Sequence, residues 1–204
     1  MKKIITLLFT AAQFLNAHAQ FTFGPKVGVN IAKENYSSTY YSTSPRVGLA
    51  AGIFTNYTFG KHFGIQAELI YSSEGTKESS PISNGVVTIN RINIPLLFQY
   101  KHPKGIYIEA GPQIGLLQSA KGKYTTGNYD FKTNTQSNLL SWCVGAGYQL
   151  NQLVQGLGAG IRYAKGFTPV NKGNVNATSI TSSVFNISVF YAVPYGKNIT
   201  HNKH

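Results

Sequence analysis

Five charged residues are the first candidates for chemistry, because each lies where apolar and polar side chains alternate along the chain. They are Arg46, Glu68, Arg91, Glu109 and Arg162. All five fall on the polar side of this alternation. An unpaired buried carboxylate is costly, so we predict that the glutamates and arginines form one network, completed by Gln66, Gln99 and Gln113. We expect the network to be structural; a proton-responsive gate is the alternative.

Catalysis is not expected from the remaining polar residues. A hydrolytic site would need Asp, His and a nucleophile close together. Asp130 is the sole aspartate, His62 and His102 fall in predicted turns, and His201 and His204 lie near the C-terminus. We therefore predict no enzyme activity, no metal and no cofactor.

The glycine-rich run 156–160 resembles half of a dinucleotide-binding loop. A helix should follow such a loop, whereas this run continues into a segment with a period of two. We expect its glycines to be small side chains facing the interior of a β structure.

The composition excludes several classes of protein. The chain has 204 residues, with 18 Lys and Arg against 6 Asp and Glu, 13 Tyr, 12 Phe and 1 Cys. A disordered chain would be richer in charge and poorer in aromatic residues, and a disulfide scaffold would need more cysteine.

Residues 1–19 have the pattern of a secretory signal peptide. Lys2 and Lys3 are followed by a short apolar run and by Ala17-His18-Ala19, a small-x-small cleavage pattern. The run is too short for a membrane-spanning helix. We expect residues 1–19 to be removed, residues 20–193 to form one β domain, and residues 194–204 to be a short tail.

Eight segments alternate apolar and polar residues with a period of two, which is typical of strands. They lie at 21–31, 47–53, 63–71, 92–100, 106–116, 140–148, 157–163 and 185–191. The connections alternate in length: those at 33–44, 72–86, 118–137 and 165–181 are long, and those at 58–62, 101–105 and 150–154 are short. Long loops at one end and short turns at the other are typical of outer-membrane barrels.

The character of the two strand faces indicates which one points outward. One face is continuous Val, Ile, Leu, Phe and Tyr, and the other is Gly, Asn, Gln, Ser, Glu and Arg, too polar for a dry core. An apolar face exposed to lipid explains this, because a closed barrel satisfies every backbone hydrogen bond. We predict an all-β, eight-stranded antiparallel up-and-down transmembrane β-barrel with short periplasmic turns and long extracellular loops.

Two motifs carry a family resemblance. They are the segments 93–101 (NIPLLFQYK) and 106–115 (IYIEAGPQIG), and the opening at 23–30 (FGPKVGVN) adds to them. Together they resemble the outer-membrane β-barrel family common in Bacteroidetes, the PorT-like group. The resemblance implies an eight-stranded outer-membrane barrel; most such barrels have no assigned function. Those barrels usually end on an aromatic residue, whereas this chain runs on past Tyr191 to His204.

The expected partners follow from the location and the charge. Seven lysines fall in the long loops: Lys33, Lys77, Lys121, Lys123, Lys132, Lys165 and Lys172. They would lie beside lipopolysaccharide phosphates. Nucleic acid is not an expected partner, whereas the barrel assembly machinery is expected during insertion. We expect a structural or interaction role, in which tyrosine-rich loops could contact surface or secretion partners. The alternative is a narrow channel or a secretion-associated accessory barrel.

Overall fold

The computed structural model describes residues 20–35, 42–80, 83–151, 153–172 and 180–194, and the remaining residues lie outside this description. The predicted signal peptide and nearly all of the predicted tail fall among those remaining residues. The strands are β1 (Gln20–Asn35), β2 (Ser42–Phe59), β3 (Phe63–Ser79), β4 (Asn84–Lys101), β5 (Ile106–Tyr124), β6 (Gly127–Asp130), β7 (Asn138–Gln149), β8 (Leu157–Gly166), β9 (Thr181–Tyr191) and β10 (Val193–Pro194). A 3₁₀ turn, η2, spans Lys132–Asn134.

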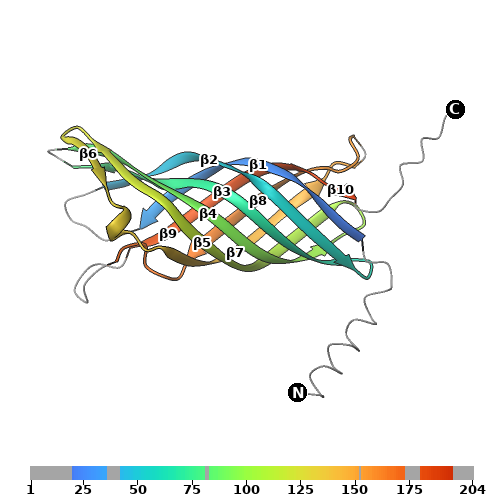
Figure 1. The fold of residues 1–204 in the computed structure, drawn as a ribbon. Coiled ribbons are helices and arrows are strands. Elements are labelled where there is room, and N and C mark those ends of the chain that lie inside the picture. The colour runs from blue at the N-terminus through green and yellow to red at the C-terminus, as the bar shows by residue number, and fades with distance from the viewer. Residues whose placement is uncertain (1–19, 36–41, 81–82, 152, 173–179, 195–204) are drawn as a thin grey trace, which may run out of the picture.

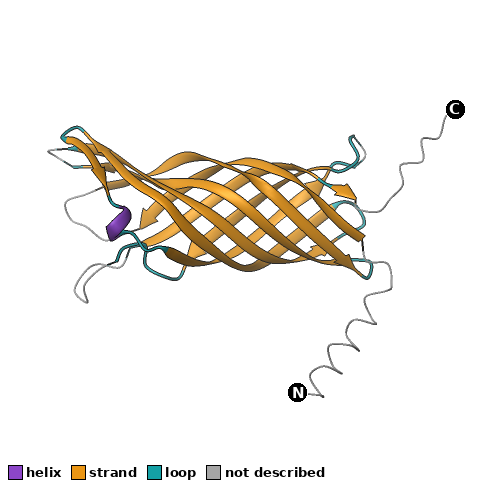
Figure 2. Cartoon of the chain, in the orientation of Figure 1, coloured by secondary structure: helices purple, strands orange, loops and turns teal. Residues whose placement is uncertain are grey.

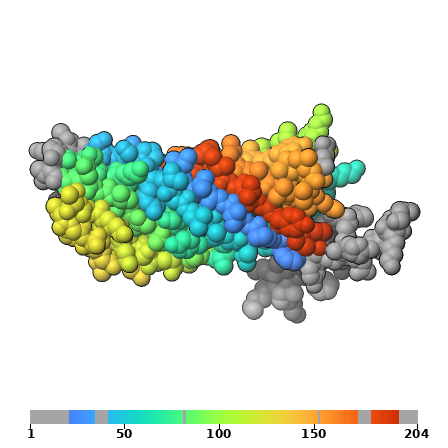
Figure 3. Space-filling model, turned by 90° about the horizontal axis from the view of Figure 1, so that it is seen from above, coloured from blue at the N-terminus to red at the C-terminus, as the bar shows by residue number. Residues whose placement is uncertain are grey.

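Eight of these strands form a closed antiparallel ring. Each strand of the series β1, β2, β3, β4, β5, β7, β8 and β9 pairs with the next, and β9 pairs back to β1 from Lys26↔Phe190 to Asn35↔Thr181. β6 extends β5 as a short hairpin, and β10 pairs with the start of β1. The tilted strands are visible in Figures 1 and 2, and in Figure 3 the blue β1 lies directly beside the red β9. The predicted eight-stranded barrel is confirmed.

The distribution of side chains is inverted relative to a water-soluble protein. Val47, Leu49 and Ile53 are 65%, 58% and 60% exposed, whereas Glu68 and Arg91 are 4% and 1% exposed. Successive residues of a strand point to opposite faces, so the same alternation that puts the apolar residues outside puts the polar ones in the lumen. The outer apolar band is therefore a surface for lipid, as expected from the sequence. The described residues contain no helix long and apolar enough to cross a membrane.

Outward-facing aromatic residues gather at the end of the barrel that carries the short turns. Phe21 contacts Tyr57, and Phe63 contacts Phe98 and Tyr100, with ring centroids 4.8 to 5.7 Å apart. Amphipathic aromatic rings favour the boundary between hydrocarbon and water. This cluster therefore marks one interface of the membrane.

Two of the expected long loops are largely strand. β3 continues to Ser79 and β4 begins at Asn84, so the loop predicted at 72–86 is a hairpin with a short connection. β5 likewise runs to Tyr124 and pairs with β6, within the loop predicted at 118–137. These extensions rise beyond the lipid, so their outer faces no longer need apolar residues and the period of two disappears. In Figure 1, β6 marks this long-loop end, opposite to β10.

Side chains fill the lumen between the two ends. Phe54, Tyr107 and Phe190 pack edge to face, with centroids 5.6 and 6.0 Å apart, and form an aromatic group. Gly147 and Gly158 leave the space for the Tyr107 and Phe190 rings, because a Cβ at either glycine would overlap the ring. The glycines predicted to face the interior of the β structure thus accommodate aromatic rings in the lumen.

A second group closes the lumen further along. Ala32, Leu97, Cys143, Ala164 and Val184 form a buried apolar cluster. Ala164 follows Arg162 by two residues on β8, which runs toward the long-loop end, whereas Tyr107 precedes Glu109 by two residues on β5, which starts at the short-turn end. The charged residues Arg162 and Glu109 therefore lie between an aromatic and an apolar layer.

Candidate functional site

Arg162 is the centre of a charged cluster inside the barrel. Its Nη1 and Nη2 each donate to one oxygen of Glu68, at 2.7 Å. Its Nε and Nη2 donate to Oε1 of Glu109, at 2.8 and 2.6 Å. The planar guanidinium suits such two-pronged contacts with carboxylates. Three of the five predicted network residues therefore meet.

Lys26 is the fourth member of this cluster, and the sequence analysis did not include it. Its Nζ donates to Glu68 Oε1 at 3.0 Å, and the residue is 7% exposed. Two cations thus face two carboxylates, so the cluster is electrically balanced. The sequence signal for this member is that Lys26 lies on the polar side of the first strand, between Pro25 and Val27.

Amide side chains add hydrogen bonds to both carboxylates. Gln66 donates to Glu68 Oε1 at 2.6 Å, and Gln99 donates to Glu109 Oε2 at 2.9 Å. Asn56 in turn donates to Gln99 Oε1 at 2.8 Å. Gln66 and Gln99 therefore act as predicted, whereas Gln113 accepts a weak bond from the Cys143 thiol at 3.4 Å instead.

The positions of the cluster members follow from the strands that carry them. Lys26, Glu68, Glu109 and Arg162 belong to β1, β3, β5 and β8, spread around the ring. Gly145 on β7 leaves room for Glu109, because a Cβ there would come within 2.9 Å of Oε1. The four residues therefore meet across the lumen, and the sequence places none of them near another.

Arg46 does not join the network, contrary to expectation. The β2–β3 pairing is interrupted between Pro45 and Ala50. The Nη1 of Arg46 reaches into this gap and donates to Ser73 Oγ at 3.1 Å and to the Glu74 carbonyl at 3.0 Å. A bulge leaves ladder groups unpaired, so Arg46 supplies hydrogen bonds that the strand pairing lacks there.

Arg91 also lies outside the central cluster. It sits at a register shift of the β4–β5 pairing and donates from Nη1 to the Gln136 carbonyl at 3.3 Å. Glu74 and Glu34 attract it electrostatically, and its Nη2 has no hydrogen-bond partner among the described residues. Arg91 therefore holds the segment between η2 and β7 over the long-loop end of the lumen.

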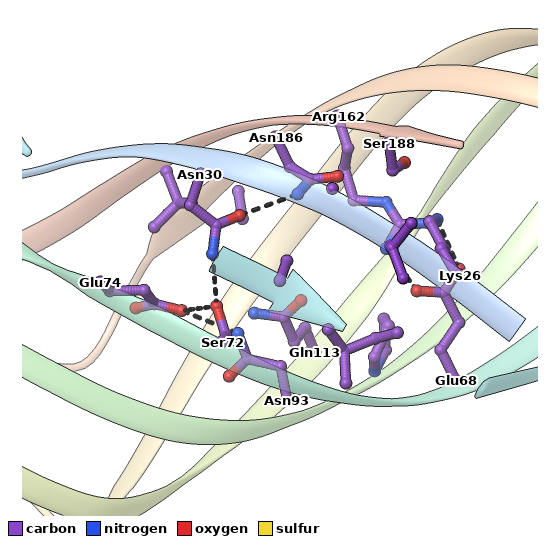
Figure 4. Close-up of a pocket in the computed structure, with 17 residues that line it drawn as sticks. Lys26, Asn30, Glu68, Ser72, Glu74, Asn93, Gln113, Arg162, Asn186 and Ser188 are labelled. Atoms are coloured by element: carbon purple, nitrogen blue, oxygen red, sulfur yellow. Dashed lines mark hydrogen bonds and ion pairs between the residues drawn. The ribbon is translucent and has the colours of Figure 1, made fainter. Parts of the chain in front are cut away.

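A second polar layer lies between the central cluster and Arg91. Asn30 donates to Ser72 Oγ at 2.8 Å, and Ser72 and Asn93 both donate to Glu74 Oε1, at 2.7 and 2.8 Å. Asn186 donates to Asn30 Oδ1 at 2.8 Å. Figure 4 shows this chain of bonds on one side of a small cavity of about 40 Å³, with Lys26, Glu68 and Arg162 on the other. A cavity of this size with polar side chains in its lining holds only a few water molecules.

The site has no arrangement for metal chemistry in the part of the chain described by the structure. No group of three or more His, Cys, Asp or Glu side chains there could hold a metal ion. The cluster is a set of closed ion pairs whose charges are matched and whose oxygens are occupied.

A closed ring of tilted strands, an apolar outer band and a polar filled lumen define a small membrane β-barrel. Comparison with protein families agrees: residues 11–172 match the family described as outer membrane protein beta-barrel domain. The chain belongs to this family, which places it in the outer membrane of a bacterium.

Solved structures show the same fold at low sequence identity. Neisserial surface protein A is 12% identical, with a TM-score of 0.53, over 83% of this chain and 96% of that one. Ail, the attachment invasion locus protein of Yersinia pestis, is 10% identical, with a TM-score of 0.52, over 84% and 98% of the two chains. A search of curated proteins finds no match to the sequence.

Proposed function

We propose that the chain is a sealed outer-membrane barrel with a structural or interaction role and no catalytic activity. The observation that carries this proposal is the filled lumen. The aromatic group, the ion cluster and the apolar cluster follow one another along the lumen. The cavity between the ion cluster and the second polar layer is about 40 Å³. Eight strands enclose a space that side chains can fill. A channel would need a continuous water-filled path and a gate would need charges that can move, whereas the charges of this cluster are paired.

The long-loop end is proposed to face the outside of the cell. Lysines occupy the outer faces of the strands there: Lys33 on β1, Lys77 on β3, and Lys121 and Lys123 on β5. Lys77 and Lys123 flank Val86, since both pair with it across β4. This cationic surface lies next to the apolar band, where lipopolysaccharide phosphates would meet it. It supports contact with the outer leaflet through strand faces rather than through loops.

The finer assignment to a PorT-like barrel of Bacteroidetes type is part of the proposal. It rests on the segments 93–101 and 106–115, which form the short-turn hairpin of β4 and β5. The proposal also includes export with cleavage after residue 19 and insertion by the barrel assembly machinery. It further includes surface or secretion partners for the loops.

Cysteine labelling on intact cells tests the orientation and the location together. Asn128→Cys places a thiol on the exposed β6 hairpin, and Lys61→Cys places one in the exposed turn between β2 and β3. We expect a membrane-impermeant maleimide to label Asn128→Cys on intact cells and Lys61→Cys only after the outer membrane is permeabilised. The unmodified chain is the control, because Cys143 is fully buried. Labelling of Lys61→Cys alone on intact cells, or of neither variant, would contradict the proposal.

A further inference from the structure

A hollow of about 250 Å³ lies at the long-loop end of the barrel, apart from the central cluster. Its apolar wall includes Val87, Ile89, Phe131, Val170 and Ile180. Ile89 and Val170 belong to a buried apolar cluster, against which the other three pack. The hollow therefore has a preformed hydrophobic floor, as small-molecule sites usually do.

Backbone hydrogen bonds fix the walls of this hollow. Gln136 N donates to the Val170 carbonyl at 2.6 Å, and Lys172 N donates to the Asn134 carbonyl at 2.8 Å. Val170 N donates in turn to the Ile180 carbonyl at 2.8 Å. The segment after η2 is thus tied to the segment after β8. Arg91 also donates a hydrogen bond to the segment after η2, at the Gln136 carbonyl.

The hollow is lined by acidic and not by basic side chains. Glu34 and Glu78 are the charged residues that line it, and none of its lining residues is basic. Tyr124 donates to Glu78 Oε2 at 2.7 Å. Glu34 is 6% exposed, and Glu74, Glu78 and the guanidinium of Arg91 are the charged groups that act on its carboxylate. Burial and the neighbouring Glu74 and Glu78 raise the pKa of Glu34 to about 8, so a cationic ligand that pairs with Glu34 would favour its charged form.

The nearby basic residues do not provide one partner for each acidic residue. Arg91 is attracted to Glu34 but also to Glu74, so one guanidinium serves two carboxylates. Lys33 and Lys77 precede Glu34 and Glu78 directly in their strands and therefore point to the outer face. The wall of the barrel separates the two signs of charge, with carboxylates inside and lysines outside.

We propose that this hollow binds a small amphipathic amine, whose apolar body packs on Ile89 and Val170 while its ammonium group pairs with Glu34. The inference does not depend on the structural role proposed above, because the hollow lies outside the sealed part of the lumen. The barrel would then present a ligand site on its outer side without transporting the ligand.

Calorimetric titration of the purified barrel in detergent tests this proposal with three probes of similar shape. They are phenethylamine, the neutral 2-phenylethanol and the anionic 3-phenylpropionate. We expect saturable binding of the amine and at least roughly tenfold weaker binding of the other two, because a charge-assisted bond is lost. The proposal would be overturned if the alcohol bound as tightly as the amine, or if the amine showed no saturable binding. This test needs only the native protein.

Two variants then locate the site. Glu34→Gln should weaken amine binding by roughly tenfold or more. Asp130→Asn is the matched control, because Asp130 is an exposed carboxylate on β6 that does not line the hollow; its affinity should stay within about twofold. Heat-modifiable mobility on gels confirms that both variants are folded. Undiminished binding by folded Glu34→Gln would place the amine elsewhere and overturn the assignment.

Discussion

Arg162→Met is expected to lower the free energy of unfolding by about 3 to 5 kcal/mol, because it leaves buried carboxylates without their main partner. Arg162 makes four of the hydrogen bonds that hold Glu68 and Glu109, and Lys26 alone cannot balance two negative charges. Urea titration in phospholipid vesicles, followed by the fluorescence of the single tryptophan, Trp142, measures the loss. Trp142 faces outward, so its emission reports contact with lipid.

A second substitution tests whether the loss of stability comes from the charge imbalance. Adding Glu109→Gln to Arg162→Met restores neutrality, because Lys26 then faces Glu68 alone. The double variant should be more stable than Arg162→Met. Lys165→Met is the matched control on the same strand: Lys165 is part-exposed and bonds to the hydroxyls of Thr181 and Ser183, so its loss should cost less than about 1 kcal/mol. Native stability of Arg162→Met would refute the role given to the cluster.

Gly147→Ala is expected to destabilise the barrel by about 1 to 3 kcal/mol through overpacking of the lumen. A Cβ at this position would overlap the end of the Tyr107 ring and crowd the Ala159 carbonyl. The ring cannot easily retreat, because it packs against Phe190 at a centroid distance of 6.0 Å. The same urea titration measures the change.

A second lumen-facing glycine provides the control for this substitution. At Gly166 an added Cβ would meet its nearest atoms at 3.5 Å, an ordinary contact, so Gly166→Ala should change stability by less than about 0.5 kcal/mol. In a Tyr107→Ala background the cost of Gly147→Ala should fall, because the ring that it strikes is gone. Equal effects of the two glycine substitutions would mean that the lumen is not packed as described.

The alternation of side chains predicted the fold because lipid and lumen impose opposite demands on successive residues. It placed Glu68, Glu109 and Arg162 correctly in the lumen, and it failed where that contrast ends. Beyond Ser72 on β3 and beyond Leu117 on β5, the outer face carries lysines, namely Lys77, Lys121 and Lys123, so the apolar alternation ends and the sequence predicts loops where the strands continue.

Alternation also could not show which lumenal residues meet. It assigns a face to each residue, whereas contact depends on the height of that residue along the barrel, which is set by the register and stagger of all eight strands. For this reason the sequence groups Arg46 and Arg91 with the central arginine, although each lies at a break in the strand pairing. A network predicted from arginines and glutamates alone does not contain Lys26, although Lys26 lies on the same polar face.

Conductance in planar lipid bilayers tests the central claim, that the lumen is sealed by its own side chains, most directly. Insertion of the purified barrel should produce no steady current above that of the protein-free bilayer, and Glu68→Gln and Glu109→Gln should remain equally silent. A porin reconstituted in parallel shows that the bilayer reports open barrels. Steady conductance steps from the native barrel, with an amplitude that changes in Glu68→Gln or Glu109→Gln, would contradict the account and identify the ion cluster as part of a conducting path.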